Sequence, residues 1–274
     1  MKDVTISFDR VPIHYEVRGS GAPALVFVHG WSCDRSYWDG QTGDFASQYQ
    51  VVTIDLAGHG ESGLQRNSWS ISAFGRDVAA VVEKLGLKPV VLVGHSMGGP
   101  VIVEAARLMP DRLAGLVGVD TYRNLADVRT AEEIDQFLAP LRANFREATQ
   151  KFASSMFISS SDPDLAKRVV ADMSAAPPVV GFAASKAVRD NDRNLQAGLQ
   201  ELRELKVPVV AINSDYRPND LEAAGRYGVR IQTMSRVGHF VMLEDPGTFN
   251  RLLKETIDEF AGIVGREDRT MLGH

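Results

Sequence analysis

The hydrophobic positions of the chain follow two alternating patterns. Continuous runs of β-branched and other apolar residues predict strands buried on both faces, at 25–28, 51–54, 90–93 and 113–119. Between the second and third runs, apolar residues recur at helical spacing and predict a helix over 72–85: Phe74, Val78, Val81, Val82 and Leu85. Strands that alternate with helices are typical of a parallel sheet with right-handed crossovers.

The two ends of the chain extend this sheet. Alternation over 5–8 and 13–17, broken at Pro12, predicts an antiparallel hairpin at a sheet edge. Two more strands are predicted at 207–212 and 229–234, and an amphipathic helix from about Pro246 to Phe260. From 122 to 202 the chain shows helical patterns without a strand, a stretch too long for a simple connection.

These elements predict one fold class and one division of the chain. We expect an α/β fold with a mostly parallel sheet of about eight strands, flanked by helices. Residues 1–121 and 203–274 would form its core. Residues 122–202 would form an inserted helical cap over the carboxyl ends of the strands, where ligands bind in such sheets.

Composition narrows the class of partner. The 274 residues carry a net charge of −5, which argues against nucleic acid or an anionic membrane surface as a partner. Cys33 is the single cysteine, so no internal disulfide is possible. The charged N-terminus does not resemble a signal peptide, and no apolar run is long enough to span a membrane. We therefore expect a cytoplasmic protein, either a monomer or a homodimer.

A serine lies at the sharpest predicted turn of the chain. Gly94-His95-Ser96-Met97-Gly98 follows the run at 90–93 and precedes a helical segment, which is the pattern of a nucleophile elbow. The glycines are needed because a Cβ at either flank would collide with the packed strand and helix. This turn would expose the Ser96 hydroxyl to a base and would place the Met97 backbone N–H beside a developing oxyanion.

A serine nucleophile needs a base. Only two of the six histidines follow Ser96 in the chain, His239 and the terminal His274. His239 comes shortly after the last predicted strand, in a loop at the same edge of the sheet. We therefore expect His239 to be the base.

Four motifs together make the chain resemble the α/β-hydrolase family over nearly its whole length. They are His29-Gly30-Trp31, the stretch 55–62, the elbow at 94–98, and Gly238-His239-Phe240 followed by Glu244-Asp245-Pro246. The resemblance implies that Trp31 donates its backbone N–H to an oxyanion hole alongside Met97.

The acid that orients the histidine departs from the family's commonest pattern. That pattern has Gly-x-x-Asp after the seventh strand, where this chain holds Arg217 in the acid position. Other members of the family take the acid from the end of the sixth strand, which is Asp120 here. We expect Asp120 to be the acid, with Asp215 as the alternative and Asp220 as a third candidate.

We therefore expect a serine hydrolase that cleaves carboxylic esters of small to medium apolar substrates through an acyl-enzyme on Ser96. The alternatives are hydrolysis of a carbon–carbon bond, cofactor-free perhydrolase activity, or a ligand-binding sensor on the same fold. Gly58 to Gly63 matches G-x-G-x-x-G, but no helix begins within it, so no dinucleotide cofactor is expected. No cysteine pair or histidine cluster indicates a metal site.

Overall fold

Eight strands form a single mixed sheet in the order β1-β2-β4-β3-β5-β6-β7-β8. The computed structural model describes residues 1–271, and their side chains through residue 263. β1 and β2 pair antiparallel with each other, and β2 pairs antiparallel with β4; the remaining pairs are parallel. The strands are β1 (Lys2–Ile6), β2 (Pro12–Arg18), β3 (Ala24–Val28), β4 (Val51–Ile54), β5 (Val90–His95), β6 (Leu113–Val119), β7 (Val209–Ser214) and β8 (Val229–Met234).

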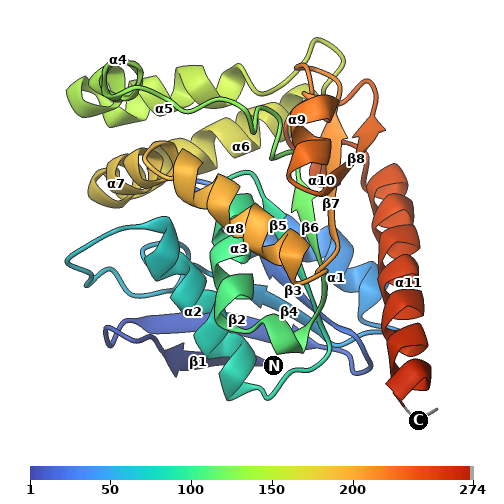
Figure 1. Cartoon of the computed structure of the whole chain (residues 1–274). Helices are drawn as coiled ribbons and strands as arrows, with labels where there is room; N and C mark the ends of the chain where they lie inside the picture. The colour runs from blue at the N-terminus through green and yellow to red at the C-terminus, as the bar shows by residue number, and fades with distance from the viewer. Residues whose placement is uncertain (272–274) are drawn as a thin grey trace.

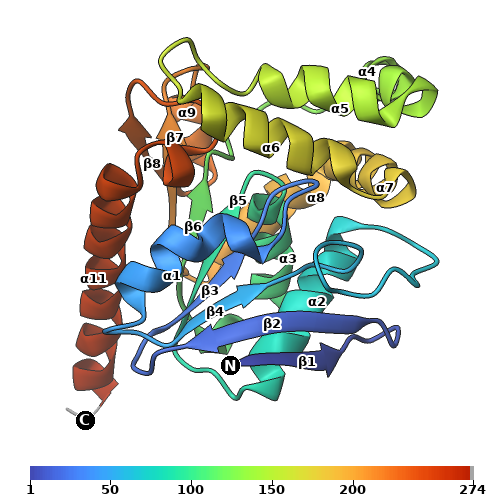
Figure 2. The same ribbon diagram turned by 180° about the vertical axis from the view of Figure 1, so that it is seen from behind.

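Helices cover both faces of the sheet. Two of them, α1 (Asp39–Phe45) and α11 (Pro246–Met271), lie on one face, and Figure 2 shows them in front. The other face carries α2 (Ile71–Lys84), α3 (Gly98–Leu108) and α8 (Asp192–Glu204), as Figure 1 shows. The α/β class and the mostly parallel sheet of about eight strands that the sequence predicts are confirmed.

A second layer of helices lies above the carboxyl ends of the strands (Figures 1 and 2). It consists of α4 (Ala131–Ala143), α5 (Phe145–Ser154), α6 (Pro163–Ala175) and α7 (Pro178–Arg189), called the upper helices below. α8 follows them in the chain but packs against α3 beside the sheet. Short helices complete the fold: η1 (Arg35–Trp38), η2 (Pro110–Arg112), α9 (Leu221–Arg226) and α10 (Val241–Glu244).

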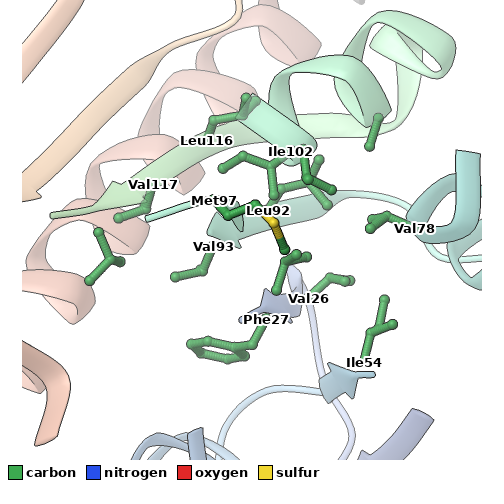
Figure 3. Packing of buried hydrophobic residues seen from close by; sticks show 14 of the residues in the cluster. Val26, Phe27, Ile54, Val78, Leu92, Val93, Met97, Ile102, Leu116 and Val117 are labelled. Carbon is green, nitrogen blue, oxygen red and sulfur yellow. The ribbon is translucent and has the colours of Figure 1, made fainter. Parts of the chain in front are cut away.

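The core is one cluster of buried side chains that extends over both faces of the sheet. Every residue of β3, β4 and β5 is buried, as their continuous apolar runs predict. Figure 3 shows side chains from neighbouring strands pointing alternately to the two faces, with Leu92 beside Ile102 of α3 and Phe27 on the other side. Across the second face, the Phe27 ring packs 5.0 Å from that of Trp38, between ring centroids.

Two predicted boundaries are wrong. The first strand spans Lys2–Ile6 and not 5–8, because Ser7 and Arg10 form the turn of the hairpin, with the Arg10 N–H donating to the Ser7 carbonyl at 3.0 Å. The last helix continues to Met271 instead of ending near Phe260, since no proline interrupts it. None of the helices within the described residues is both long and apolar enough to cross a bilayer.

Candidate active site

Ser96 lies at a strained turn between β5 and α3. Its φ is 50°, in the left-handed region that non-glycine residues rarely adopt, and its N–H donates to the Val119 carbonyl at 2.9 Å. A Cβ added to Gly94 would lie 2.3 Å from the Gly98 carbonyl oxygen, and one added to Gly98 would lie 2.5 Å from that of Val28. Both glycines are therefore required for the close packing of strand against helix.

His239 lies in the loop that follows β8, and it is buried. Its backbone N–H donates to the Met156 carbonyl at 2.8 Å, and its ring Nδ1 lies 2.6 Å from Asp120 Oδ2. The imidazole lines the same cavity as Ser96. The carboxylate thus fixes one ring nitrogen, and the arrangement leaves Nε2 as the nitrogen that can act on a group in the cavity.

Asp120 directly follows β6 and is almost fully buried. Its Oδ1 accepts hydrogen bonds from the N–H of Ser214 at 2.7 Å, from the Ser214 hydroxyl at 2.9 Å, and from Arg123. Burial alone would raise the pKa of Asp120, but the hydrogen bond and charge of His239 and the charge of Arg123 outweigh burial, so the pKa lies below its usual value. The carboxylate therefore stays ionised beside the imidazole.

The other two candidate carboxylates lie elsewhere. Asp215 is exposed, and its N–H extends the pairing of β7 with β8 by donating to the Met234 carbonyl at 3.0 Å. The Asp220 side chain caps α9 by accepting the N–H of Ala223 at 2.9 Å. Of the three acids that the sequence offers, the structure brings Asp120 to the imidazole.

Arg123 donates to Asp120 Oδ1, the carboxylate oxygen that does not contact His239. The sequence did not identify this arginine as a site residue. Besides its ion pair with Asp120, it donates through Nη1 to the Arg217 carbonyl at 2.8 Å and to Asn219 Oδ1 at 3.1 Å. It therefore joins the loops that follow β6 and β7. The sequence does show a basic residue three positions after a candidate acid. That spacing indicates an ion pair only when the loop after β6 is known to bring the two side chains together.

Glu244 holds the histidine loop. Its carboxylate accepts the N–H of Gly238 at 3.0 Å and of Phe240 at 3.2 Å, on the two sides of His239, and it also accepts the hydroxyl of Ser161. Ser161 lies between α5 and α6, so Glu244 links the loop to the upper helices. The motif Glu244-Asp245-Pro246 marked this loop in the sequence, without indicating what the carboxylate contacts.

Trp31 and Met97 are both buried and both line the cavity with Ser96. Within the described part of the chain, neither backbone N–H donates to a protein acceptor. The Trp31 indole is held on the upper helices, because Nε1 donates to the Gly181 carbonyl at 2.7 Å and the ring packs against Phe145 and Phe152. Two free backbone donors therefore accompany the hydroxyl and the imidazole.

The cavity contains about 620 Å³ of empty space, part of it continuous with solvent. Its wall is mostly apolar, and part of it comes from Phe152, Met173 and Val188 of the upper helices and from Met156, which follows α5. Two arginines, Arg189 and Arg217, also line it. Among the residues whose structure is described, no group of three or more His, Cys, Asp or Glu side chains could hold a metal ion.

Three further histidines near the site are buried. The His29 ring accepts the Leu56 N–H at Nε2 (3.0 Å), so this nitrogen carries no proton. The His95 ring lies 4.6 Å from that of His239, between centroids, and His59 lies 5.0 Å from His29. Burial lowers the pKa of His29 to about 4 and those of His59 and His95 to about 3. All three rings are therefore neutral packing groups at neutral pH.

The chain is similar to a known protein family and to several curated proteins. Residues 25–252 match the model of the "Alpha/beta hydrolase family". A non-heme haloperoxidase from Rhodococcus erythropolis is 40% identical over 118 residues, 43% of this chain and 41% of that protein. A karrikin insensitive 2 receptor from Petunia hybrida is 25% identical over 250 residues, 84% of this chain and 90% of that protein.

The likeness of fold extends over nearly the whole chain. An esterase from Thermogutta terrifontis has a TM-score of 0.80 at 23% identity, over 95% of this chain and 99% of its own. At that identity the comparison speaks for the fold alone. The chain spans about a third of the length of several curated relatives that it matches. One of them is an acetyltransferase component of an acetoin cleaving system from Pseudomonas putida, of which the matched segment covers 35%.

Proposed function

Because the chain belongs to the alpha/beta hydrolase family, we propose that it is a serine hydrolase cleaving carboxylic esters of small to medium apolar substrates. The observation that carries this proposal is the contact of 2.6 Å between Asp120 Oδ2 and His239 Nδ1, with the imidazole and Ser96 lining one cavity. The apolar wall favours apolar acyl or alcohol groups.

In the proposed mechanism the three side chains act in sequence. His239 removes the proton of Ser96 through Nε2 as the serine oxygen attacks the ester carbonyl. Asp120 accepts the hydrogen bond of Nδ1–H, holds the imidazole in that tautomer and stabilises the imidazolium. His239 then protonates the leaving alcohol, and a water molecule activated by the same imidazole releases the acid from Ser96.

Trp31 and Met97 would supply the oxyanion hole. Their backbone N–H groups are unbonded within the described residues, and both residues line the cavity beside Ser96. Preorganised donors of this kind stabilise the tetrahedral oxyanion, typically by about 3 kcal/mol for each donor. The upper helices would form a lid that excludes water from the cavity.

Arg123 would keep Asp120 ionised and oriented in this mechanism. Its positive charge helps to hold the pKa of Asp120 below the usual value, so the acid remains a carboxylate throughout the reaction. With Ser214, it occupies Oδ1 and leaves Oδ2 for the imidazole.

Hydrolysis of p-nitrophenyl esters with acyl chains of two to twelve carbons tests the proposal. We expect the wild type to turn over the shorter esters and Ser96→Ala to lose about 10⁴-fold or more in kcat, while its Tm stays near that of the wild type. A fluorophosphonate probe should add to Ser96 in the wild type, as seen by peptide mass spectrometry, and not in the variant.

A different result would point to another class. If no ester is turned over and the probe does not label Ser96, the hydrolase proposal fails, and the sensor function becomes the better one. Turnover that is equal in the wild type and in Ser96→Ala would equally refute it.

A further inference from the structure

Arg189 is the last residue of α7, and its guanidinium is fixed along one edge. Nη1 donates to the carbonyl oxygen and to the hydroxyl of Ser185, each at 2.9 Å, one turn earlier in the same helix. The guanidinium carbon lies 3.2 Å from the ring centroid of Phe137 on α4, which packs beside α7 (Figure 1). Nε and Nη2 have no partner among the described residues.

The acids close to Arg189 in sequence are already paired with other cations. Asp192 pairs with Arg129, whose Nε donates to it at 2.8 Å, and Asp190 pairs with Lys186. Arg189 itself forms no ion pair within the described residues. Burial and then the charge of Arg129 lower the pKa of Arg189 to about 9, against the opposing charge of Asp192, so the group is still a cation at neutral pH.

Arg189 borders two cavities, and the one outside the candidate active site is also lined by Arg129, Asp190 and Asp192. Arg189 lines the cavity that Ser96 and His239 also line. Of the other side chains that line this cavity, Ser185 already accepts from Arg189, and Val188, Phe152 and Met173 are apolar. A mostly buried cation without a counter-ion is unfavourable, and an anion that enters the cavity would relieve this.

We propose that Arg189 is a specificity-determining residue that binds a carboxylate of the substrate, so that the preferred substrates are esters that also carry a free carboxylate. This inference rests on the proposed ester hydrolase function and names its substrate class. The open edge of a guanidinium, formed by Nε and one Nη, matches a carboxylate in a bidentate pair. One guanidinium balances a single negative charge, which favours a carboxylate over a phosphate dianion in an apolar cavity.

The chemistry is compatible with the space available. The cavity that both Ser96 and Arg189 line holds about 620 Å³ of empty space, part of it open to solvent, and its wall is mostly apolar, as is usual for small-molecule sites. The ester carbonyl would lie at Ser96 and the carboxylate at Arg189, with an apolar chain along Phe152 and Met173 between them. Arg217, an exposed residue that also lines the cavity, would attract the same anion as it enters.

A matched pair of substrates tests this assignment. The mono-p-nitrophenyl ester of adipic acid carries a free carboxylate, and p-nitrophenyl hexanoate has the same chain length without it. We expect the wild type to prefer the adipate ester. Arg189→Met should lower kcat/KM for the adipate ester about 10- to 100-fold, mainly through KM, and leave the hexanoate within about threefold. Arg189→Lys keeps the positive charge but cannot form the bidentate pair, so it should recover part of the lost kcat/KM for the adipate ester.

Arg193→Met is the matched control. Arg193 is exposed, follows four residues later and does not line the cavity, so its removal changes the net charge equally. We expect it to leave both substrates unchanged. An equal loss on both esters in Arg189→Met would indicate that Arg189 only fastens α7 to α4, and a wild-type preference for the hexanoate would also overturn the proposal.

Binding to a variant that cannot react separates this inference from the proposed function. On Ser96→Ala, calorimetry should show monomethyl adipate binding at least 10-fold more tightly than dimethyl adipate, with the difference lost in Ser96→Ala/Arg189→Met. If no ester is turned over and the fluorophosphonate probe does not label Ser96, but this difference is found, the hydrolase proposal fails and the carboxylate site stands. Equal binding of both adipates, or tighter Arg189-dependent binding of phenyl phosphate than of benzoate, would overturn the carboxylate assignment.

Discussion

The strand ends of the sheet and the upper helices contribute to the same cavity but are held in different ways. Every residue of β3, β4 and β5 is buried, whereas only three of ten residues in α5 and three of thirteen in α6 are buried. The polar side chains at the strand ends are fixed by several contacts each; Asp120 alone accepts from Ser214, Arg123 and His239.

Hydrogen bonds at separate points attach the upper helices and the chain between α5 and α6 to the rest of the fold. Among them are the bond from the Trp31 indole to the Gly181 carbonyl, the bond from the His239 N–H to the Met156 carbonyl, and the bond from the Ser161 hydroxyl to Glu244. The two regions therefore have different roles in the proposed function. In that function the sheet would position the reacting groups, and the helices would supply part of the wall that selects a substrate. Changes at strand ends should therefore affect kcat or folding, and changes in the helices should affect KM.

The largest effect should follow from removing the charge at the end of β6. Asp120→Asn would present an amide to the imidazole and favour the wrong tautomer, so kcat should fall by up to about 10⁴-fold. Asp215→Asn, an equivalent change at an exposed carboxylate, should alter kcat less than threefold. Ester hydrolysis by the two purified variants measures both values, and the reverse ranking would contradict the role assigned to Asp120.

Replacing one phenylalanine in each region by alanine compares how much the two regions contribute to the stability of the fold. Phe27→Ala removes a fully buried ring of β3 and should lower the free energy of unfolding by about 3–5 kcal/mol. Phe152→Ala removes a partly buried ring of α5 that lines the cavity, so we expect about 1–2 kcal/mol and a raised KM. Urea unfolding and steady-state kinetics test the pair. Equal losses of stability would remove the distinction between the two regions.

Acid should destabilise the fold through the buried histidines near the strand ends. Burial lowers the pKa of His29, His59 and His95 to between about 3 and 4, below the ordinary value of about 6.5 expected in the unfolded chain. The unfolded chain therefore binds more protons in this window. The stability is fully present above pH 6.5 and is lost as the pH falls towards 4, by up to about 1.4 kcal/mol per pH unit for each histidine.

Thermal unfolding at pH 7.5, 6.5, 5.5 and 4.5 tests this expectation. Tm should be level between the first two values and should fall between the last three. His95→Gln, which removes one of the three rings, should have a shallower fall than the wild type. A Tm that does not change between pH 6.5 and 4.5 would contradict the neutral state of these rings.

The smallest effect should come from the link between the two regions. Glu244→Gln weakens two backbone hydrogen bonds around His239, so we expect kcat to fall about 10-fold. Ser161→Ala removes only the contact to the upper helices and should change kcat less than about threefold. A larger loss for Ser161→Ala than for Glu244→Gln would show that the helices, and not the loop alone, position the imidazole.

The local pattern of the chain was enough to predict much of this architecture. Continuous apolar runs predict buried strands because a strand covered on both faces has no polar side, and these runs became β3, β4, β5 and β6. The elbow at Ser96 was visible because its geometry requires small residues at fixed neighbouring positions, which are Gly94 and Gly98.

The tertiary structure decided which distant side chains meet. The sequence favoured Asp120 over Asp215 and Asp220 as the partner of His239 through a family resemblance, but the order of these acids along the chain could not show which of them reaches the imidazole. The choice depends on the register of β6 against β7, which pairs Val119 with Ile212 and brings Asp120 beside Ser214.

The same reason explains what the sequence did not reveal. Arg123, Glu244 and Arg189 carry no periodic signal, because each acts through contacts that exist only after loops and helices pack. An arginine on an amphipathic helix is ordinarily a solvated residue. Only the packing of α4 against α7, beside the cavity, leaves Arg189 a mostly buried cation that forms no ion pair within the described residues. Local sequence thus determined the elements and the turn at Ser96, and the long-range packing determined which acid contacts His239 and the charge of the cavity wall.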